Sequence, residues 1–202
     1  HRIHSHLLAL GLLADAFGYE NLFMHLWKTR EHIMDAMEYT TGGRVMLSAC
    51  CIGGVRKDIN PEQRKFVEKQ LDVSEKELKN VFATLLDDYT VKKRTVGVGV
   101  ISGETAYECG AVGPTARGSG LNTDHRMTGY LAYRKLGFRS CVEKGGDSYS
   151  RTKVRVRETL ESIRLIREAL IKMPEGEIKT PFKGNPKGEV VVRAEQPRGE
   201  VL

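Results

Sequence analysis

The sequence has no apolar run long enough to cross a bilayer. A membrane-spanning helix needs about 18–20 consecutive apolar residues, and the apolar stretch at residues 7–17 is shorter than that. This stretch resembles the core of a signal peptide, but no convincing small-residue cleavage site follows it. We therefore expect a cytoplasmic location, peripheral to the membrane and attached to it through partner subunits.

Cysteine is scarce, and its spacing does not suggest a metal site. The four cysteines are Cys50, Cys51, Cys109 and Cys141, and no two of them form a C-x-x-C pair. Scattered cysteines in a chain of this size are typical of free thiols in a reducing compartment. Neighbouring side chains on an extended chain point to opposite faces, so Cys50 and Cys51 cannot readily share one ion. We expect both to be small buried residues that pack a loop.

Other common site motifs are missing as well. His1, His4 and His6 lie close together, but the H-E-x-x-H pattern is absent, so these residues are expected to be structural or interface histidines. Residues 111–120 predict a glycine-rich loop, yet they lack the G-x-x-x-x-G-K-S/T pattern of a phosphate-binding loop. The sequence thus predicts no metal ligands of its own.

Basic residues outnumber acidic ones, with a net charge of +6 and a pI of about 9.1. The densest basic runs lie at residues 92–94 and 151–157, and no aromatic residues interleave with them. Nucleic-acid-binding surfaces combine basic residues with aromatic side chains on which bases stack. We therefore expect these runs to be solvated faces or subunit contacts, and we expect no nucleic acid partner.

Helical periodicity dominates the rest of the chain. It predicts long helices over residues 1–17, 20–39, 60–89 and 148–173, and a break near Val73 is an alternative for the third. Short pieces follow from local signals: a helix over 102–110, extended structure over 95–101 and a strand over 189–194. The predicted fold class is mainly α, a bundle of about four long helices with short β strands and glycine-rich loops, in a single domain over residues 1–202.

Several charged residues are candidates for function. A strand that runs into Pro197-Arg198-Gly199 presents an arginine from a rigid turn, and a fixed guanidinium has five donors for an anionic ligand. An ordinary turn arginine is the alternative. Glu158 and Glu161 flank the apolar stripe of the last helix. Buried, functionally tuned carboxylates are one interpretation, but charges on a helix surface are the default expectation.

Seven short motifs occur in order along the whole chain. They are His1-Arg-Ile-His-Ser-His-Leu-Leu8, Arg30-Glu31, Thr41-Gly-Gly-Arg44, Ile52-Gly-Gly-Val-Arg-Lys-Asp58, Gly113-Pro-Thr-Ala-Arg-Gly-Ser-Gly120, Gly146-Asp-Ser-Tyr-Ser-Arg151 and Glu195-Gln-Pro-Arg-Gly-Glu200. The set resembles the large catalytic subunit of membrane-bound, energy-converting nickel–iron hydrogenases, whose relative is the 49-kDa-type subunit of respiratory complex I. The resemblance implies a hydrogenase large-subunit-like fold.

The resemblance also implies what is missing. In these hydrogenases two C-x-x-C motifs hold nickel and iron, and neither motif is present in this chain. One would precede His1 and the other would follow Leu202, so we expect the central part of a longer large subunit. The implied nickel–iron centre then belongs to the full-length parent. The fragment alone is expected to hold no cofactor and to be inactive.

One site residue carries over from the hydrogenases. The arginine of their E-x-P-R-G motif sits over the metal pair, which implies that Arg198 is catalytic and that Pro197 and Arg198 bind the cofactor. Gln196 departs from the commoner alanine of this motif. A basic residue also stands at this position in the quinone-reducing branch, so Arg198 marks the superfamily better than the activity.

The resemblance implies an oxidoreductase subunit for reversible proton reduction and H2 oxidation, with an iron–sulfur small subunit and membrane subunits as partners. The alternative is a 49-kDa-type NADH:quinone oxidoreductase subunit that lines the quinone site. Many complex I subunits have a histidine just before Ile-Gly-Gly-Val, where this chain has Met46 and Leu47, which favours the hydrogenase branch. A second alternative is a non-catalytic assembly surface.

Overall fold

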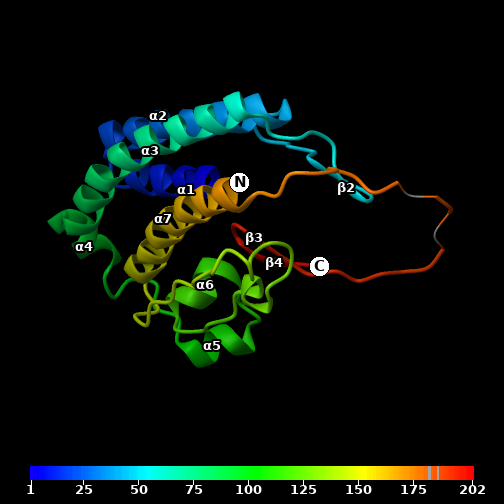
Figure 1. Cartoon of the computed structure of the whole chain (residues 1–202). Helices are drawn as coiled ribbons and strands as arrows, with labels where there is room; N and C mark the ends of the chain where they lie inside the picture. Colours follow the sequence, from blue (N-terminus) through cyan, green and yellow to red (C-terminus); the bar gives the residue numbers. More distant parts are fainter. Residues whose placement is uncertain (182, 186) are drawn as a thin grey trace.

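The structure is a computed structural model that describes residues 1–181, 183–185 and 187–202. Helices dominate it, so the mainly α class is confirmed (Figure 1). The longer helices are α1 Arg2–Ala16, α2 Glu20–Thr41, α3 Pro61–Asp87 and α7 Ser148–Lys172. The shorter ones are α4 Tyr89–Thr95, α5 Gly103–Glu108, α6 Gly113–Gly118 and the 3-10 helix η1 His125–Thr128.

The longer helices form a closed ring around one apolar core. α1 packs against both α2 and α7, and α3 also contacts both of them. Each helix turns an apolar stripe inward, as its periodicity predicts. Leu7, Leu26, Leu78 and Ile163, one from each helix, are at most 1% exposed. Burial of these stripes, rather than helix propensity alone, stabilises the bundle.

α3 shows how a local signal and a long-range pattern can compete. It starts at a capping box, where the Asn60 side chain accepts from the Gln63 amide and the Gln63 side chain accepts from the Asn60 amide. The alternative of a break near Val73 is wrong, because the helix continues through it. Ser74 lies inside the helix with its side chain buried, since the apolar stripe runs on past this position.

The glycine-rich segment is also more regular than expected. The loop predicted over residues 111–120 contains α6 over Gly113–Gly118. Pro114 stands in its first turn, where a helix does not need the missing N–H. Arg117 in this short helix is fully buried, so packing against the rest of the chain holds a segment whose composition favours a loop.

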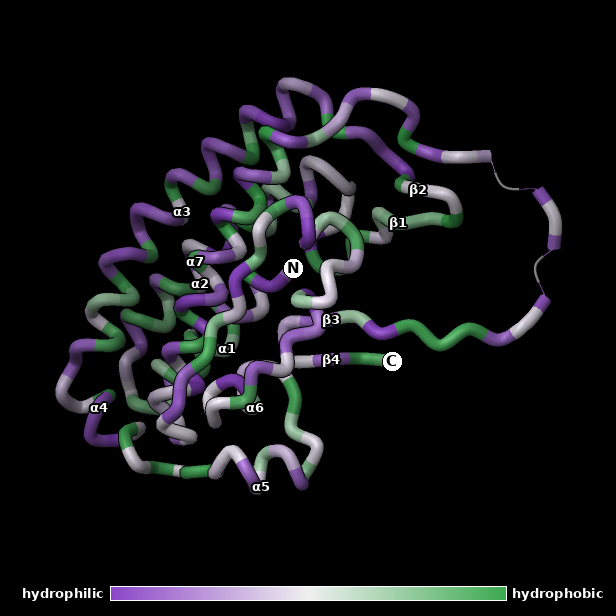
Figure 2. Tube along the Cα trace, turned by 60° about the horizontal axis from the view of Figure 1, so that its bottom comes forward, coloured by the Kyte–Doolittle hydropathy of each residue, from purple (hydrophilic) through white to green (hydrophobic). Residues whose placement is uncertain are grey.

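Two of the predicted β segments differ from the structure. The strand predicted over residues 189–194 begins only at Ala194, where β3 Ala194–Gln196 pairs antiparallel with β4 Gly199–Val201. The three preceding valines are 67% to 83% exposed, and they form the hydrophobic stretch before β3 in Figure 2. The extended segment predicted over residues 95–101 is not a strand either: Thr95 ends α4, and residues 96–99 form a turn and a bend. Valine favours strands, but a strand also needs a partner to pair with.

The segment with Cys50 and Cys51 forms a small hairpin of β1 Cys50–Cys51 and β2 Gly54–Val55. A distant segment lies against it: the Val55 amide donates to the Ile178 carbonyl and the Thr180 amide donates to the Gly53 carbonyl. A Cβ atom on Gly53 or Gly54 would collide with the carbonyl oxygens of this segment. The glycine pair therefore permits a close approach of two backbones.

No helix within the described parts of the chain combines the length and the apolar character needed to span a bilayer.

Candidate functional site

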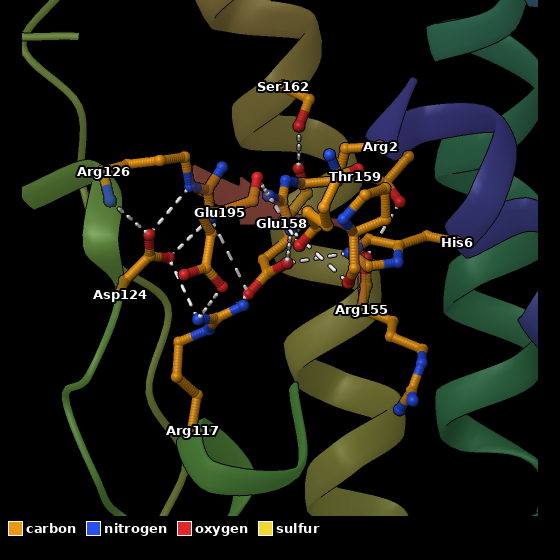
Figure 3. A network of polar contacts seen from close by, with 12 residues as sticks. Arg2, His6, Arg117, Asp124, Arg126, Arg155, Glu158, Thr159, Ser162 and Glu195 are labelled. Atoms are coloured by element: carbon orange, nitrogen blue, oxygen red, sulfur yellow. Dashed lines mark hydrogen bonds and ion pairs between the residues drawn. The ribbon is translucent and has the colours of Figure 1, made fainter. Parts of the chain in front are cut away.

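A group of charged side chains is buried where the helical bundle meets the C-terminal hairpin (Figure 3). We call it the charge cluster. Its members come from α1, α6, the η1 region, α7 and β3, and each is at most 8% exposed: Arg2, Arg117, Asp124, Arg126, Glu158 and Glu195. Three arginines face three carboxylates, so the charges balance. Buried charges are tolerated only when they are paired and hydrogen-bonded in this way.

Glu158 is the centre of the charge cluster. One carboxylate oxygen accepts from His6 Nε2 at 2.8 Å and lies 3.2 Å from Arg2 Nη1. The other oxygen accepts from Arg117 Nε at 2.7 Å. Burial by itself would raise the pKa of this carboxyl, but the hydrogen bond from His6 and the positive charges of Arg117 and Arg2 lower the pKa to about 2. Glu158 is therefore a fixed negative charge at neutral pH.

His6 is the neutral partner of this carboxylate. Burial lowers the pKa of its imidazole to about 4, although Glu158 acts in the opposite direction. Because Glu158 can only accept, His6 carries its proton on Nε2 at neutral pH. The interaction is thus a hydrogen bond to a charged acceptor rather than an ion pair.

Arg117 connects three carboxylates. Its Nη1 donates to Glu195 at 2.8 Å and lies 3.3 Å from Asp124, while its Nε holds Glu158. Burial lowers the pKa of this guanidinium, but the carboxylates of Glu158, Asp124 and Glu195 outweigh it and raise the pKa above its usual value. Its Nη2 is buried and finds no acceptor among the described residues.

Arg126 closes the cluster on the side of η1. Its guanidinium binds both oxygens of Asp124, at 2.9 and 2.6 Å, in the two-pronged geometry that matches an arginine to a carboxylate. The same guanidinium lies over the ring of Phe138, 4.1 Å from its centroid. Asp124 also caps η1 through the Arg126 amide. Asp124 and Arg126 are two residues apart, so this ion pair forms within one short segment.

The charge cluster holds the β3–β4 hairpin, which carries the predicted site residues. The second carboxylate oxygen of Glu195 accepts from the His125 amide at 3.0 Å, and the Glu195 amide donates to the Tyr130 hydroxyl at 3.0 Å. Pro197 and Arg198 form the turn that follows. Pro197 is half-buried, whereas the Arg198 side chain is exposed. The turn thus presents a guanidinium at the surface while its base is fixed in the interior.

The cysteines do not behave as the sequence suggests. Cys50 is exposed and Cys51 is half-buried, so the expectation that both are buried loop residues is wrong. A two-residue strand at the edge of the fold leaves them near solvent. Cys141 is half-buried as well, and burial raises the pKa of its thiol to about 11, which keeps it out of the thiolate form that binds soft metals.

Metal ligation by this chain finds no support in its geometry. Among the residues that the structure describes, no group of three His, Cys, Asp or Glu side chains is arranged to hold a metal ion. The thiolates that suit nickel are not brought together. The side chains present therefore do not fit a nickel–iron centre as ligands, and Arg198 is a donor group rather than a ligand.

The comparisons with known proteins define the family of the chain. The chain belongs to the family of the respiratory-chain NADH dehydrogenase 49 Kd subunit, whose model matches residues 17–184. This confirms the resemblance that rests on the seven motifs. The match covers most of the helical bundle and the charge cluster's members from α6, the η1 region and α7.

Individual relatives come from both branches. The chain is 39% identical to the membrane-bound hydrogenase subunit alpha of Pyrococcus furiosus, over 100% of this chain and 51% of that protein. It is 38% identical to the carbon monoxide-induced hydrogenase of Rhodospirillum rubrum, over 100% of this chain and 56% of that protein. It is 33% identical to an NADH-quinone oxidoreductase subunit of Chloroherpeton thalassium, over 99% of this chain and 52% of that protein. The chain spans about half the length of the curated relatives it matches.

The sequence predicts the turn at Pro197-Arg198-Gly199, but it predicts neither the β3–β4 pairing nor the charge cluster beneath it. Glu158 is a helix-surface charge by default expectation, and the structure places it at 1% exposure. The sequence feature that could have indicated its burial is its position beside the apolar stripe of the last helix. Arg2, Arg117 and Glu195 stand in three of the seven motifs, but nothing in the local sequence shows that these motifs meet.

Proposed function

We propose that the chain is the central part of a hydrogenase large subunit within a membrane-bound complex that interconverts protons and H2. A nickel–iron centre, held by other segments of the parent subunit, supplies the H2 chemistry when it is bound. Electrons arrive from an iron–sulfur small subunit, and membrane subunits complete the assembly. The segment of residues 1–202 forms one domain of this protein, peripheral to the membrane and on its cytoplasmic side. By itself this segment is inactive.

The hairpin turn at Arg198 is the observation that carries this proposal. We assign Arg198 as the catalytic residue, and Pro197 with Arg198 as the cofactor-binding pair. The guanidinium is exposed, and the turn behind it is anchored in a buried cluster. An anchored arginine can hold its five donors in one direction, which suits recognition of anionic ligands of a cofactor.

One sequence feature and the names of two relatives favour H2 chemistry over quinone reduction. Met46 and Leu47 stand where many quinone-reducing relatives have a histidine, and Met46 is exposed on the loop before β1. The names of two relatives also point to hydrogenases, at 39% and 38% identity. A subunit of the F(420)H(2) dehydrogenase of Methanosarcina mazei is 38% identical as well, so identity alone does not decide between the branches.

The alternative function is that of a 49-kDa-type subunit that lines a quinone site. Its specific support is the family match over residues 17–184 and the similarity to NADH-quinone oxidoreductase subunits. In that case the complex reduces quinone and forms no H2.

The test is substitution of Arg198 by Lys in the complete complex, followed by measurement of H2 formation from a reduced viologen dye. Lysine keeps the charge but loses the planar set of donors, so we expect turnover to fall about tenfold or more. The matched control is Arg193→Lys beside the same hairpin, where the side chain is 62% exposed and pairs with Glu200. Equal activity in Arg198→Lys, Arg193→Lys and the unmodified complex would contradict the proposal.

A further inference from the structure

We propose that Arg2, at the start of α1, is a positioning residue that fixes the direction of the Arg198 turn. This inference rests on the proposed function of Arg198. Arg2 and Arg198 are far apart in the sequence, and nothing in the local pattern of either segment connects them. The connection comes from the backbone of the three residues that precede Arg198.

The Arg2 guanidinium binds this backbone directly. Its Nη2 donates to the carbonyl of Glu195 at 3.0 Å and to the carbonyl of Gln196 at 3.1 Å. Its Nη1 lies 3.5 Å from the carbonyl of Pro197. These carbonyls are consecutive and lead into Arg198. One planar group therefore fixes the orientation of successive peptide units at the base of the turn.

The Arg2 side chain is itself held in place by Glu158 and by burial. Its Nη1 reaches Glu158 at 3.2 Å, and Arg2 is 8% exposed. Burial lowers the pKa of its guanidinium, and Glu158 partly offsets this by favouring the charged form. A side chain that is packed and paired in this way has few alternative rotamers, so the carbonyls it binds are held in one place.

A second contact is made at the turn itself. A Cβ atom on Gly113 would collide with the carbonyl oxygen of Arg198, and a Cβ atom on Gly199 would collide with the side chain of Val112. The start of α6 thus lies against the turn itself. Arg2 fixes the residues before Arg198, and this backbone contact fixes Arg198 and the residue after it.

Arginine is required for this role because of its shape. A lysine ammonium is a single point with rotatable donors, and it cannot span Glu158 and several carbonyls at once. In Arg2→Lys the charge of the cluster is retained while the hold on the turn is lost. Because a displacement of about 1 Å at a reacting group can cost ~100-fold in rate, we expect a loss of turnover of about tenfold.

The experiment is Arg2→Lys in the complete complex, assayed for H2 formation in the unmodified and in the Arg198→Lys backgrounds. If Arg2 acts through Arg198, the substitution lowers turnover about tenfold in the first background and less than twofold in the second. The same fold-loss in both backgrounds, or no loss in the first, would overturn the inference.

The matched control is Arg30→Lys. Arg30 is another little-exposed arginine that donates to a backbone carbonyl, that of His4 in α1, rather than to the carbonyls of the hairpin. We expect turnover in Arg30→Lys to stay within twofold of the unmodified complex. A loss equal to that of Arg2→Lys would show that any weakened arginine contact to α1 has this effect, and the inference would be wrong.

Hydrogen–deuterium exchange of the complex separates the inference from the proposed function. We expect peptides that cover residues 194–201 to exchange faster in Arg2→Lys and to be unchanged in Arg30→Lys. If Arg198→Lys retains full turnover, the proposed function fails, while faster exchange still supports the hold of Arg2 on the turn. Unchanged exchange contradicts that hold whatever the activity. Tyr130→Phe, which removes the acceptor of the Glu195 amide, provides a milder second variant if Arg2→Lys does not assemble.

Discussion

The helical bundle and the charge cluster are adjacent, but different forces stabilise them. The bundle is closed by apolar stripes of α1, α2, α3 and α7, and its strength is spread over many small contacts. The cluster depends on a few buried charges that must all be present. Removal of one apolar side chain leaves a cavity, whereas removal of one charge leaves its partners buried and unbalanced.

This difference bears on function. An apolar core tolerates changes in side-chain shape, because the transfer free energy does not depend on direction. Hydrogen bonds between charged groups do depend on direction, so they can hold a backbone in a defined orientation. The β3–β4 hairpin has little apolar core of its own, and the charge cluster supplies its orientation. We infer that the bundle stabilises the fold while the cluster positions the turn.

The largest effect that separates the two regions is expected from Glu158→Gln. Glutamine keeps the size of the side chain but leaves Arg2 and Arg117 without their central counter-charge. We expect the free energy of unfolding to fall by about 3–5 kcal/mol, measured by urea unfolding of the purified protein. The control on the same helix is Glu168→Gln, an exposed partner of Lys172, whose loss of stability is expected to be far smaller because solvent screens this pair. Similar losses for both variants would contradict a central role of Glu158.

A comparable but smaller loss is expected in the core of the bundle. Leu78 is fully buried, and Leu78→Ala should lower the free energy of unfolding by about 3 kcal/mol through lost burial and a residual cavity. Leu12 on α1 is 53% exposed, and Leu12→Ala should cost less than about 1 kcal/mol. Turnover per folded complex should not change in Leu78→Ala. If Leu78→Ala lowers turnover without lowering stability, the bundle also positions the site, and the separate roles assigned to the two regions are wrong.

The pH dependence of stability tests His6. Burial holds the pKa of His6 at about 4, below its unfolded value of 6.5, so the unfolded chain binds this proton first as the pH falls. Stability from this group is complete above about pH 6.5 and is lost as the pH falls toward 4. Between about pH 7 and about pH 5 the loss is about 2 kcal/mol. In His6→Gln this part of the fall in the free energy of unfolding should be absent. Urea unfolding at both pH values measures it.

His4 provides the comparison for this titration, because burial also lowers the pKa of its imidazole to about 4. The His4 side chain does not contact Glu158. His4→Gln should therefore weaken the pH dependence of the free energy of unfolding without disturbing the charge cluster. If His6→Gln leaves the pH dependence of the free energy of unfolding unchanged, the folded and unfolded chains bind this proton equally, which contradicts the lowered pKa of His6.

The smallest effect is expected at the start of α3. Asn60→Ala removes one half of the capping box and should cost about 1 kcal/mol. Asn80→Ala, at an exposed position inside the same helix, should stay within about 0.5 kcal/mol of the unmodified protein. Thermal unfolding followed by circular dichroism measures both. Equal midpoints for the two variants would mean that the cap adds nothing to this helix.

The bundle could be predicted from sequence because its signals are local. The spacing of apolar residues gives the helices, and Asn60-Pro61 and Asp147 give two of their starts. Local sequence patterns mispredict the segments whose structure is decided by tertiary contacts. Packing makes a helix of residues 113–118, and the valines at 190–192 form no strand because no partner lies beside them among the described residues.

The charge cluster could be predicted only in part. Motif order identified the segments that contain Arg2, Arg117 and Glu195, but distances between segments are a property of the fold. Glu158 is the clearest example: 41 residues separate it from Arg117, and 152 from His6. Helical periodicity places it beside an apolar stripe without showing which arginines face it. That residues 1–202 form a single domain stays a prediction.

The most direct test of the proposed function is the activity of the intact membrane complex that contains this chain. We predict H2 formation from protons with a low-potential electron donor, abolished or strongly lowered in Arg198→Lys and unchanged in Arg193→Lys. Quinone reduction without any H2 formation would contradict the assignment and would place the protein in the quinone-reducing branch.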